Sequence, residues 1–274
     1  MNDSQTWLIT GANRGLGRAL TLAALEAGHS VLATVRGEHS LPESDRLAVQ
    51  RLDVTDRTGA ADAVAEASRR FGRLDVLVNN AGYGLIGAIE EVDEDAARAI
   101  IDTDLFGALW LSQAALPVMR AQGSGQIVQI STVGAVGTMP TLGLYNAAKW
   151  ALEGFSEALA AEVREFGIRV TIAELGEIDT EWATGSMRFA DPNPAYDELR
   201  ESIFGSPTVP WPESDGTSGS GTSPEVAAAA ILAHVTNPTD DRLRLLIGDD
   251  APGQVRAALD LRLADYARDS RFSD

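Results

Sequence analysis

Short runs of apolar and β-branched residues alternate along the chain with longer segments in which apolar residues recur at a helical period. The runs cover 7–10, 31–35, 48–54, 76–78, 126–131, 170–173 and 243–247. The helical segments cover 16–27, 58–71, 95–119, 145–166 and 225–235, and three of them end beside a glycine, the usual stop signal. This alternation predicts an α/β fold: a doubly wound, parallel sheet of about seven strands with helices on both faces. Ligands of such sheets lie at the carboxyl ends of the strands.

Two regions depart from this rhythm. Residues 182–224 contain Trp182, several prolines and the Gly/Ser/Thr-rich stretch 216–223, which indicates a long loop. A loop of this length is either a mobile substrate lid or only a mobile connection. Residues 254–268 are predicted to form a final amphipathic helix. We find no internal repeat, so a single domain is expected across residues 1–274.

Composition removes several classes of protein. The 274 residues are 45% hydrophobic and 23% charged, which is enough apolar material for one large core. The absence of cysteine excludes a disulfide scaffold, a thiol nucleophile and any zinc site with cysteine ligands. The three histidines have no metal-ligand spacing, so we expect no metal site and no zinc-dependent alcohol dehydrogenase.

The net charge of −18 argues against binding to nucleic acid or to anionic membrane surfaces, because both repel a strongly negative protein. The first ten residues have neither a basic nor an apolar leader region, and no stretch reaches the roughly 20 apolar residues that span a bilayer. We therefore expect a cytoplasmic protein.

The segment Thr10-Gly11-Ala12-Asn13-Arg14-Gly15-Leu16-Gly17 joins the first predicted strand to the first predicted helix. Glycines let the backbone turn sharply and approach a pyrophosphate, and a helix N-terminus near Gly15 favours an anion. The spacing Gly-x3-Gly-x-Gly differs from the commoner Gly-x-Gly-x-x-Gly, but its strand-to-helix context predicts a nucleotide-binding, Rossmann-type domain. A tight turn without a ligand is the alternative.

Four motifs in this order resemble the short-chain dehydrogenase/reductase family. They are the glycine turn, Leu52-Asp53-Val54, Asn79-Asn80-Ala81-Gly82 and Tyr145-Asn146-Ala147-Ala148-Lys149, and the likeness runs from Trp7 to about Ile247. The resemblance implies a nicotinamide-dependent oxidoreductase. It assigns cofactor binding to Gly11, Asn13, Arg14, Gly15, Leu16, Gly17, Asp53, Val54, Asn80, Ala81, Gly82, Tyr145, Lys149, Ile178 and Thr180. The chain has Leu175-Gly176 where the family usually has Pro-Gly, which loosens the turn before Ile178.

The pair Tyr145 and Lys149 also has a chemical logic of its own. Residues four apart on a helix project to one face, one turn apart. A tyrosine hydroxyl has a pKa near 10 in water, and an ammonium beside it lowers that pKa toward the range where proton transfer is efficient. We therefore expect Lys149 to lower the pKa of Tyr145, which would be the catalytic acid and base. A surface helix on which the two residues merely coexist is the alternative.

In the family a hydroxyl, usually serine, stands 13 residues before the tyrosine and polarises the substrate oxygen. That interval leads to Thr132 and not to Ser131. Neighbouring residues of a regular strand point to opposite faces, so only one of the two enters the site. We predict Thr132, whose methyl group narrows the pocket and restricts χ1. A bulge in the strand would bring in Ser131 instead.

The family's asparagine in the helix after the fourth strand aligns with Asp104, ahead of Leu105-Phe106-Gly107. The resemblance assigns this position a kink in the helix and a backbone carbonyl that holds water for a proton relay to the lysine. A backbone role survives the change to aspartate, whereas a side-chain amide donor is lost. We expect Asp104 to modify the catalytic rate and to steady Lys149. An acid on the helix surface is the alternative.

The end of the second predicted strand bears on the choice of cofactor. NAD enzymes place an acid there to bind the adenosine ribose, but this chain has Thr34-Val35-Arg36. A guanidinium cannot accept a hydrogen bond from a ribose hydroxyl but suits a 2′-phosphate. Arg14 in the glycine turn supplies a second cation, so we predict NADP(H) as the cofactor. Two solvated arginines are the alternative.

These observations predict reversible, NADPH-dependent reduction of a ketone or aldehyde. Tyr145 would give the proton, Thr132 would hold the oxygen and Lys149 would bind the nicotinamide ribose. The alternatives are an epimerase or dehydratase of the same fold, and a cofactor-binding regulator without turnover.

Family geometry suggests a hydrophobic substrate pocket lined by apolar residues, which could instead be core residues. They are Tyr83, Val133, Leu142, Trp182, Met187 and Phe189. Segments 95–119 and 145–166 form subunit contacts in relatives, so a homodimer or homotetramer is expected.

Overall fold

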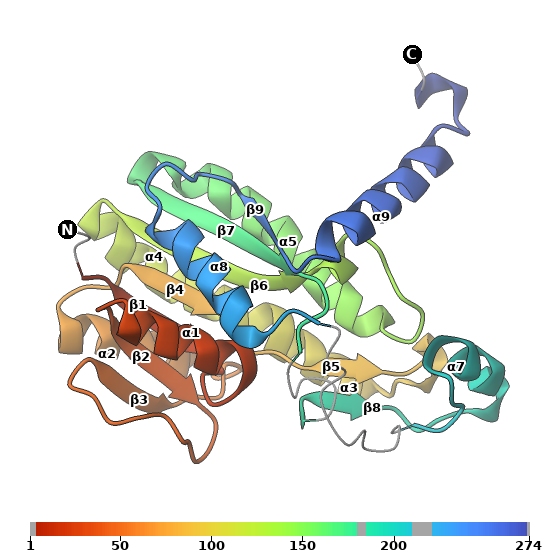
Figure 1. Cartoon of the computed structure of the whole chain (residues 1–274), viewed down its shortest axis with the longest axis horizontal. Helices are drawn as coiled ribbons and strands as arrows, with labels where there is room; N and C mark the ends of the chain where they lie inside the picture. The colour runs from red at the N-terminus through yellow and green to blue at the C-terminus, as the bar shows by residue number, and fades with distance from the viewer. Residues whose placement is uncertain (1–3, 180–184, 210–220, 273–274) are drawn as a thin grey trace.

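Seven parallel strands form the central sheet, in the order β3-β2-β1-β4-β6-β7-β9 (Figure 1). The computed structural model describes residues 4–179, 185–209 and 221–272. The strands are β1 (Thr6–Thr10), β2 (Ser30–Val35), β3 (Leu47–Arg51), β4 (Val76–Asn79), β6 (Gly125–Thr132), β7 (Ile168–Leu175) and β9 (Arg244–Ile247). Each strand overlaps one of the predicted runs, so the predicted α/β, doubly wound fold class is confirmed.

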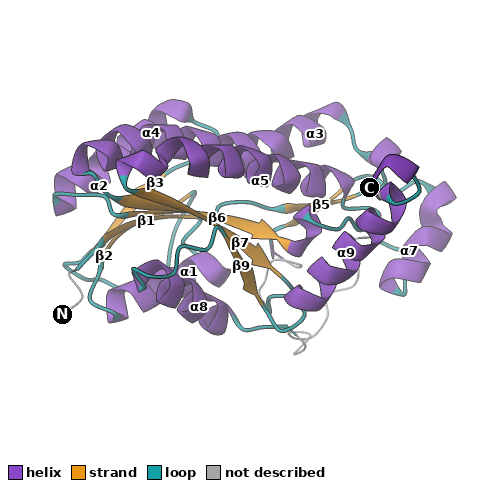
Figure 2. Ribbon diagram, turned by 90° about the horizontal axis from the view of Figure 1, so that it is seen from above, coloured by secondary structure: helices purple, strands orange, loops and turns teal. Residues whose placement is uncertain are grey.

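Helices cover both faces of the sheet (Figure 2). Helices α1 (Gly15–Glu26) and α8 (Pro224–Thr236) pack on one face, and α2 (Arg57–Phe71), α4 (Gly107–Gln122) and α5 (Gly143–Val163) pack on the other. Because successive strand residues point to opposite faces, neighbours such as Trp7 and Leu8 belong to two different hydrophobic clusters. The inner strands are largely buried on both faces, which explains their nearly continuous apolar sequences, whereas the edge strands β3 and β9 are partly exposed.

The helix predicted over 95–119 is interrupted. It consists of α3 (Glu94–Ile101), a π-helical segment η2 (Asp102–Phe106) and α4. Asp104 lies in the π-helical segment and is buried. Single π-helical turns inside α-helices are frequent at functional sites, and this one directs a carboxylate inward.

The expectation of one long loop over 182–224 is wrong for the part that the structure describes. This part contains β8 (Met187–Phe189), which pairs in parallel with β5 (Gly84–Ile86), the 3-10 turn η5 (Pro194–Tyr196) and helix α7 (Asp197–Phe204). These elements are three to eight residues long, too short for a periodic apolar pattern to show in the sequence.

The last helix, α9 (Ala251–Tyr266), extends away from the sheet (Figure 1). Its leucines do not share one buried face, because Leu259, Leu261 and Leu263 are all exposed. The helix itself was predicted, but the amphipathic pattern is not found. Within the described ranges, no helix combines the length and the apolar character needed to cross a membrane.

Candidate active site

A cavity of about 1840 Å³ opens at the carboxyl ends of the central strands. Pockets for one small ligand span about 300–1,000 Å³, so this cavity has room for a dinucleotide and a second molecule. Among the described residues, every predicted site residue except Phe189 lines the cavity. Thr180 and Trp182 lie outside the described residues.

The glycine turn is held by backbone geometry that side chains would block. Gly11 has φ of +65°, and a Cβ on Gly17 would lie 2.4 Å from the carbonyl oxygen of Gly11. The Nδ2 of Asn80 donates hydrogen bonds to the carbonyls of Thr10 (2.8 Å) and Gly11 (3.3 Å). Asn80 directly follows β4, the neighbour of β1 in the sheet, and so holds the turn from that side. No side chain caps the N-terminus of α1 among the described residues, so its first N–H groups can receive an anion.

Two arginines stand at this end of the cavity. Arg14 donates from Nη2 to the carbonyl of Gly185 (2.6 Å) and to Oγ of Ser186 (2.8 Å). Arg36 follows the end of β2 and lines the cavity. Neither arginine forms an ion pair within the described part of the chain. Both guanidinium groups are therefore placed to receive an anionic ligand.

Asp53, predicted to contact the adenine, is fixed beside the same region. Its carboxylate accepts hydrogen bonds from the backbone N–H (3.0 Å) and the hydroxyl (2.8 Å) of Thr55. The pKa of Asp53 is lowered, first by the backbone hydrogen bond and also by the nearby charge of Arg36. The carboxylate is therefore ionised at neutral pH and acts as a hydrogen-bond acceptor.

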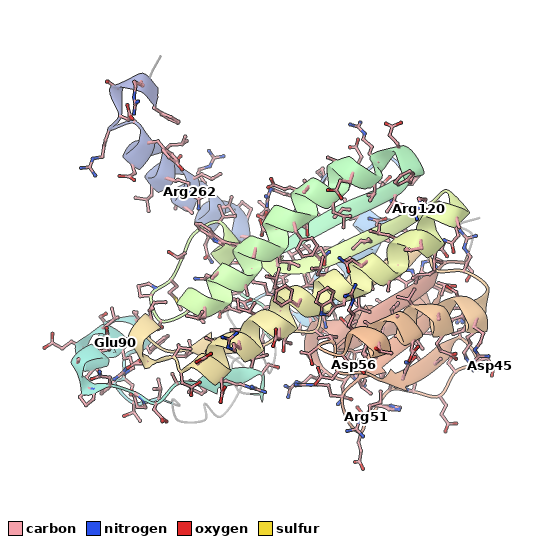
Figure 3. The ribbon with its side chains drawn as sticks, turned by 180° about the vertical axis from the view of Figure 1, so that it is seen from behind. Asp45, Arg51, Asp56, Glu90, Arg120 and Arg262 are labelled. Carbon is pink, nitrogen blue, oxygen red and sulfur yellow. The ribbon has the colours of Figure 1, made fainter. Side chains whose placement is uncertain are left out.

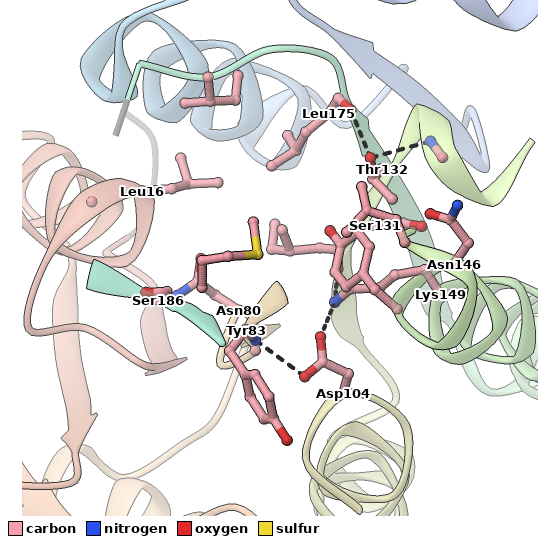
Figure 4. Close-up of a pocket in the computed structure, with 18 of the residues that line it drawn as sticks. Leu16, Asn80, Tyr83, Asp104, Ser131, Thr132, Asn146, Lys149, Leu175 and Ser186 are labelled. Atoms are coloured by element: carbon pink, nitrogen blue, oxygen red, sulfur yellow. Dashed lines mark hydrogen bonds and ion pairs between the residues drawn. The ribbon is translucent and has the colours of Figure 1, made fainter. Parts of the chain in front are cut away.

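Thr132 and Ser131 point to different environments at the end of β6 (Figure 4). The Thr132 Oγ1 accepts a hydrogen bond from the N–H of Gly134 (3.2 Å) and donates to the carbonyl of Leu175 (3.3 Å). Oγ of Ser131 donates to Oε1 of Glu153 at 2.6 Å. The strand pairs regularly with β7 through Thr132, so it has no bulge that would exchange the two side chains.

Lys149 and Asp104 meet at the buried side of the cavity. The Nζ of Lys149 donates to the carbonyl of Ile130 (3.1 Å) and lies 3.4 Å from Oδ2 of Asp104. Oδ1 of Asp104 accepts from the N–H of Tyr83 at 3.1 Å (Figure 4). A Cβ on Gly82 would lie 2.8 Å from the Asp104 carboxylate, so glycine is required where the chain passes it.

The expected lowering of the tyrosine pKa is not what the structure shows. Burial raises the pKa of Tyr145, the charge of Asp104 raises it further, and a hydrogen bond with Thr132 lowers it less. The Lys149 Nζ lies 5.8 Å from the centre of the Tyr145 ring and is paired with Asp104. The acid at position 104 therefore offsets the positive charge that was expected to stabilise the phenolate.

Four of the predicted substrate residues line the cavity, and one of them also packs in the core. Val133, Leu142 and Met187 line the cavity. Tyr83 lines it too, but its hydroxyl is buried without a hydrogen-bond partner among the described residues, and Arg188 lies 4.4 Å above its ring. Tyr83 packs in a cluster with Tyr145, so it is largely a core residue.

Several lining residues were missed because they come from segments far apart in the sequence. They belong to the turn after β6, to α5, to α7 and to α9: Met139, Trp150, Ile203, Phe204, Ala257, Ala258, Leu261 and Arg262. Only the tertiary fold brings them together, and no local motif marks them.

A doubly wound sheet, a glycine turn after β1 and a Tyr–Lys pair on one helix define a nucleotide-dependent oxidoreductase. The family model for short chain dehydrogenases matches residues 5–189, and the chain belongs to this family. It is similar to the oxidoreductase BOA17 of Botryotinia fuckeliana, with 39% identity over 254 residues and 90% of each chain covered.

Two solved structures agree with this assignment. A short-chain dehydrogenase from Streptomyces avermitilis superposes with a TM-score of 0.85 at 37% identity, covering 99% of this chain and 100% of the other. A short-chain dehydrogenase from Burkholderia cenocepacia, solved in complex with NADP, superposes with a TM-score of 0.75 at 26% identity, covering 98% of both chains.

Proposed function

We propose that this oxidoreductase uses NADP(H) and reduces a ketone or aldehyde to an alcohol, reversibly. The observation that carries the proposal is the hydrogen bond of Tyr145 with Thr132, in a cavity that Lys149 and the glycine turn also line. Family membership supplies the oxidoreductase class, and these side chains supply the acid and the donor that a carbonyl substrate needs.

The choice of NADP(H) is supported by Arg14 and Arg36, whose guanidinium groups suit a 2′-phosphate. The relative from Burkholderia cenocepacia that binds NADP supports it as well. The glycine turn and the open N-terminus of α1 would hold the pyrophosphate, and Lys149 would hold the nicotinamide ribose. The cofactor, when bound, supplies or accepts the hydride.

The chain's own residues then have separate tasks. The hydroxyl of Thr132 turns from the carbonyl of Leu175 to donate to the substrate's carbonyl oxygen, and the hydroxyl of Tyr145 gives its proton to that oxygen. The raised pKa of Tyr145 keeps this hydroxyl protonated at neutral pH, so it is present as a proton donor there. Asp104 holds the Lys149 ammonium in place at 3.4 Å.

The substrate end of the cavity supports a hydrophobic or aryl ketone. It is lined by Leu142, Met187, Ile203 and Phe204 together with Trp150 of α5. A bulky apolar substrate would replace water along these side chains, which is the main source of affinity in such pockets.

We also propose that the protein forms a homodimer or homotetramer. Light scattering of the purified protein would test this by measuring its mass in solution.

The decisive experiment follows absorbance at the reduced-nicotinamide band with NADPH and NADH in parallel, over aliphatic, aryl and diketone substrates. Faster oxidation of NADPH than of NADH with a ketone supports the proposal. Conversion of a substrate without net cofactor oxidation would identify an epimerase or dehydratase instead. Tight binding of NADPH with no turnover of any substrate would identify a regulator.

A further inference from the structure

We propose that the ion pair of Arg200 with Glu91 fixes helix α7, which forms one wall of the cavity at the substrate end through Ile203 and Phe204. By fixing this wall, the pair sets the size of ketone that the enzyme accepts. Neither residue lines the cavity, so both act through the residues that they hold. The inference rests on the proposed function, because it concerns the substrate of the same site. Sequence patterns mark neither residue.

Arg200 of α7 is fully buried, which is rare for an arginine. Its Nη1 lies 2.5 Å from Oε1 of Glu91, and both side chains are only 2% exposed. Nη2 donates to Oδ1 of Asp197 (2.6 Å) and to the carbonyl of Asn193 (2.8 Å), and Nε donates to the carbonyl of Pro207 (2.9 Å). One guanidinium therefore ties together the segment before α7, the helix itself and the segment after it.

Glu91 provides the fixed end of this connection. It ends the 3-10 turn η1 (Ile89–Glu91) and accepts hydrogen bonds from the N–H groups of Ala88 and Asn193, both at 2.7 Å. Burial alone would raise the pKa of Glu91, but these backbone hydrogen bonds and Arg200 bring it below its usual value. A buried ion pair with its hydrogen bonds satisfied is geometrically specific, and loss of one partner leaves an uncompensated charge.

The pair is connected to the cavity through α7. Ile203 and Phe204 follow Arg200 by about one helical turn and line the cavity. The other end of the segment is held by the β5–β8 pairing and by the hydrogen bond from the N–H of Ala190 to the carbonyl of Ile86 (2.8 Å). The segment that contains the wall is therefore attached to the rest of the protein at both ends. Figure 1 shows α7 beside β5 and β8.

The tyrosine is supported separately from this wall. Tyr145 belongs to the 21-residue helix α5, which packs along the sheet, whereas α7 has eight residues and depends on Arg200. Loss of the ion pair should therefore move Ile203 and Phe204 while the reacting groups stay in place. The consequence is a change of substrate selectivity, not a general loss of chemistry.

The test is Glu91→Gln, assayed with two ketones that share one carbonyl environment and differ in apolar bulk. We expect the ratio of KM for the bulky ketone to KM for the small one to change by about tenfold, the scale of apolar pocket contacts, with kcat changing less. The matched control is Glu94→Gln, which removes an exposed partner of Arg98 at 2.7 Å and should leave the ratio unchanged. Equal effects on both ketones, or none, would overturn the proposal.

Hydrogen exchange of the wild-type protein provides a second test that needs neither a variant nor a substrate. We expect the amides of 197–204 to be protected as well as those of α3. Exchange as fast as that of 266–272 would overturn the proposal, because the wall would then not be fixed. If the wild type reduced no ketone, the proposed function would fail, but hydrogen exchange would still test this inference: faster exchange of 197–204 in Glu91→Gln than in the wild type would support it, and unchanged exchange would overturn it.

Discussion

Oδ2 of Asp104 lies 3.4 Å from Nζ of Lys149, and both side chains are almost completely buried. The family's pattern has a neutral amide where this chain has a carboxylate, so the lysine here has a charged partner of its own. Burial raises the pKa of Asp104 while Lys149 lowers it, and the carboxylate in turn raises the pKa of Tyr145. The ion pair therefore links position 104 to the proton donor of the proposed reaction.

Asp104→Asn should shift the pH dependence of catalysis to lower pH. Removal of the carboxylate removes a negative charge that raises the pKa of Tyr145. Alcohol oxidation needs the ionised tyrosine, so its rate at pH 7 should rise several-fold, whereas ketone reduction should lose rate at a lower pH than in the wild type. The measurement is kcat/KM in both directions between about pH 6 and pH 10.

Asp102→Asn is the matched control, because Asp102 lies in the same π-helical segment but is exposed. Its pH profiles should match those of the wild type. Identical profiles for Asp104→Asn and the wild type would show that Asp104 does not influence the proton donor.

Tyr145→Phe should keep the affinity for NADPH within a few-fold and lose most of the turnover. The change removes only the hydroxyl, and a positioned proton donor contributes about 10²–10⁴-fold to the rate. Titration of NADPH binding by fluorescence and steady-state kinetics with the best ketone would separate the two effects. Retained turnover would mean that another group gives the proton.

Thr132→Val and Ser131→Ala form a matched pair of hydroxyl deletions on adjacent residues. Thr132→Val should lower kcat/KM by about 10–100-fold, because the donor for the carbonyl oxygen is lost. Ser131→Ala should change kcat/KM by less than about threefold, because its hydroxyl donates to Glu153 and not into the site. A larger loss in Ser131→Ala than in Thr132→Val would refute the assignment.

The central sheet could be predicted from the sequence because its inner strands β2, β1, β4, β6 and β7 are largely buried on both faces and therefore have nearly continuous apolar runs. The site residues near β1, β4 and α5 could be named because short local motifs carry them. The wall formed by α7 could not be predicted. Arg200 and Glu91 stand 109 positions apart in the chain, and no sequence pattern relates one to the other. The raised pKa of Tyr145 was also missed, because it depends on burial of the side chain and on the charge of Asp104, both of which arise only in the tertiary fold.

Arg36→Asp should raise the KM for NADPH at least tenfold and change the KM for NADH much less. The guanidinium is proposed to pair with a 2′-phosphate that NADH lacks, and an aspartate would repel that phosphate. The control is Arg51→Asp, the same charge change at the end of β3, where the side chain extends from the body (Figure 3). Equal effects of Arg36→Asp on both cofactors would argue against the phosphate role.

Glu174→Gln should raise thermal stability at neutral pH. Glu174 shares Arg244 with Glu153 and Glu157, and burial together with these two acids raises its pKa above the usual 4.5 although Arg244 lowers it. An acid whose pKa is raised by folding stabilises the folded state below its unfolded pKa, and this stability is lost as pH rises through the folded pKa. Glutamine stays neutral and avoids that loss.

The expected increase in Tm for Glu174→Gln is about 2 °C at pH 8, shrinking toward zero as pH falls to the unfolded pKa of glutamate. Thermal unfolding followed by circular dichroism at several pH values would measure it. Glu165→Gln, at an exposed position after α5, is the control and should show no such trend. A lower Tm for Glu174→Gln at pH 8 would mean that the ion pair with Arg244 outweighs the cost of burying a third carboxylate beside it.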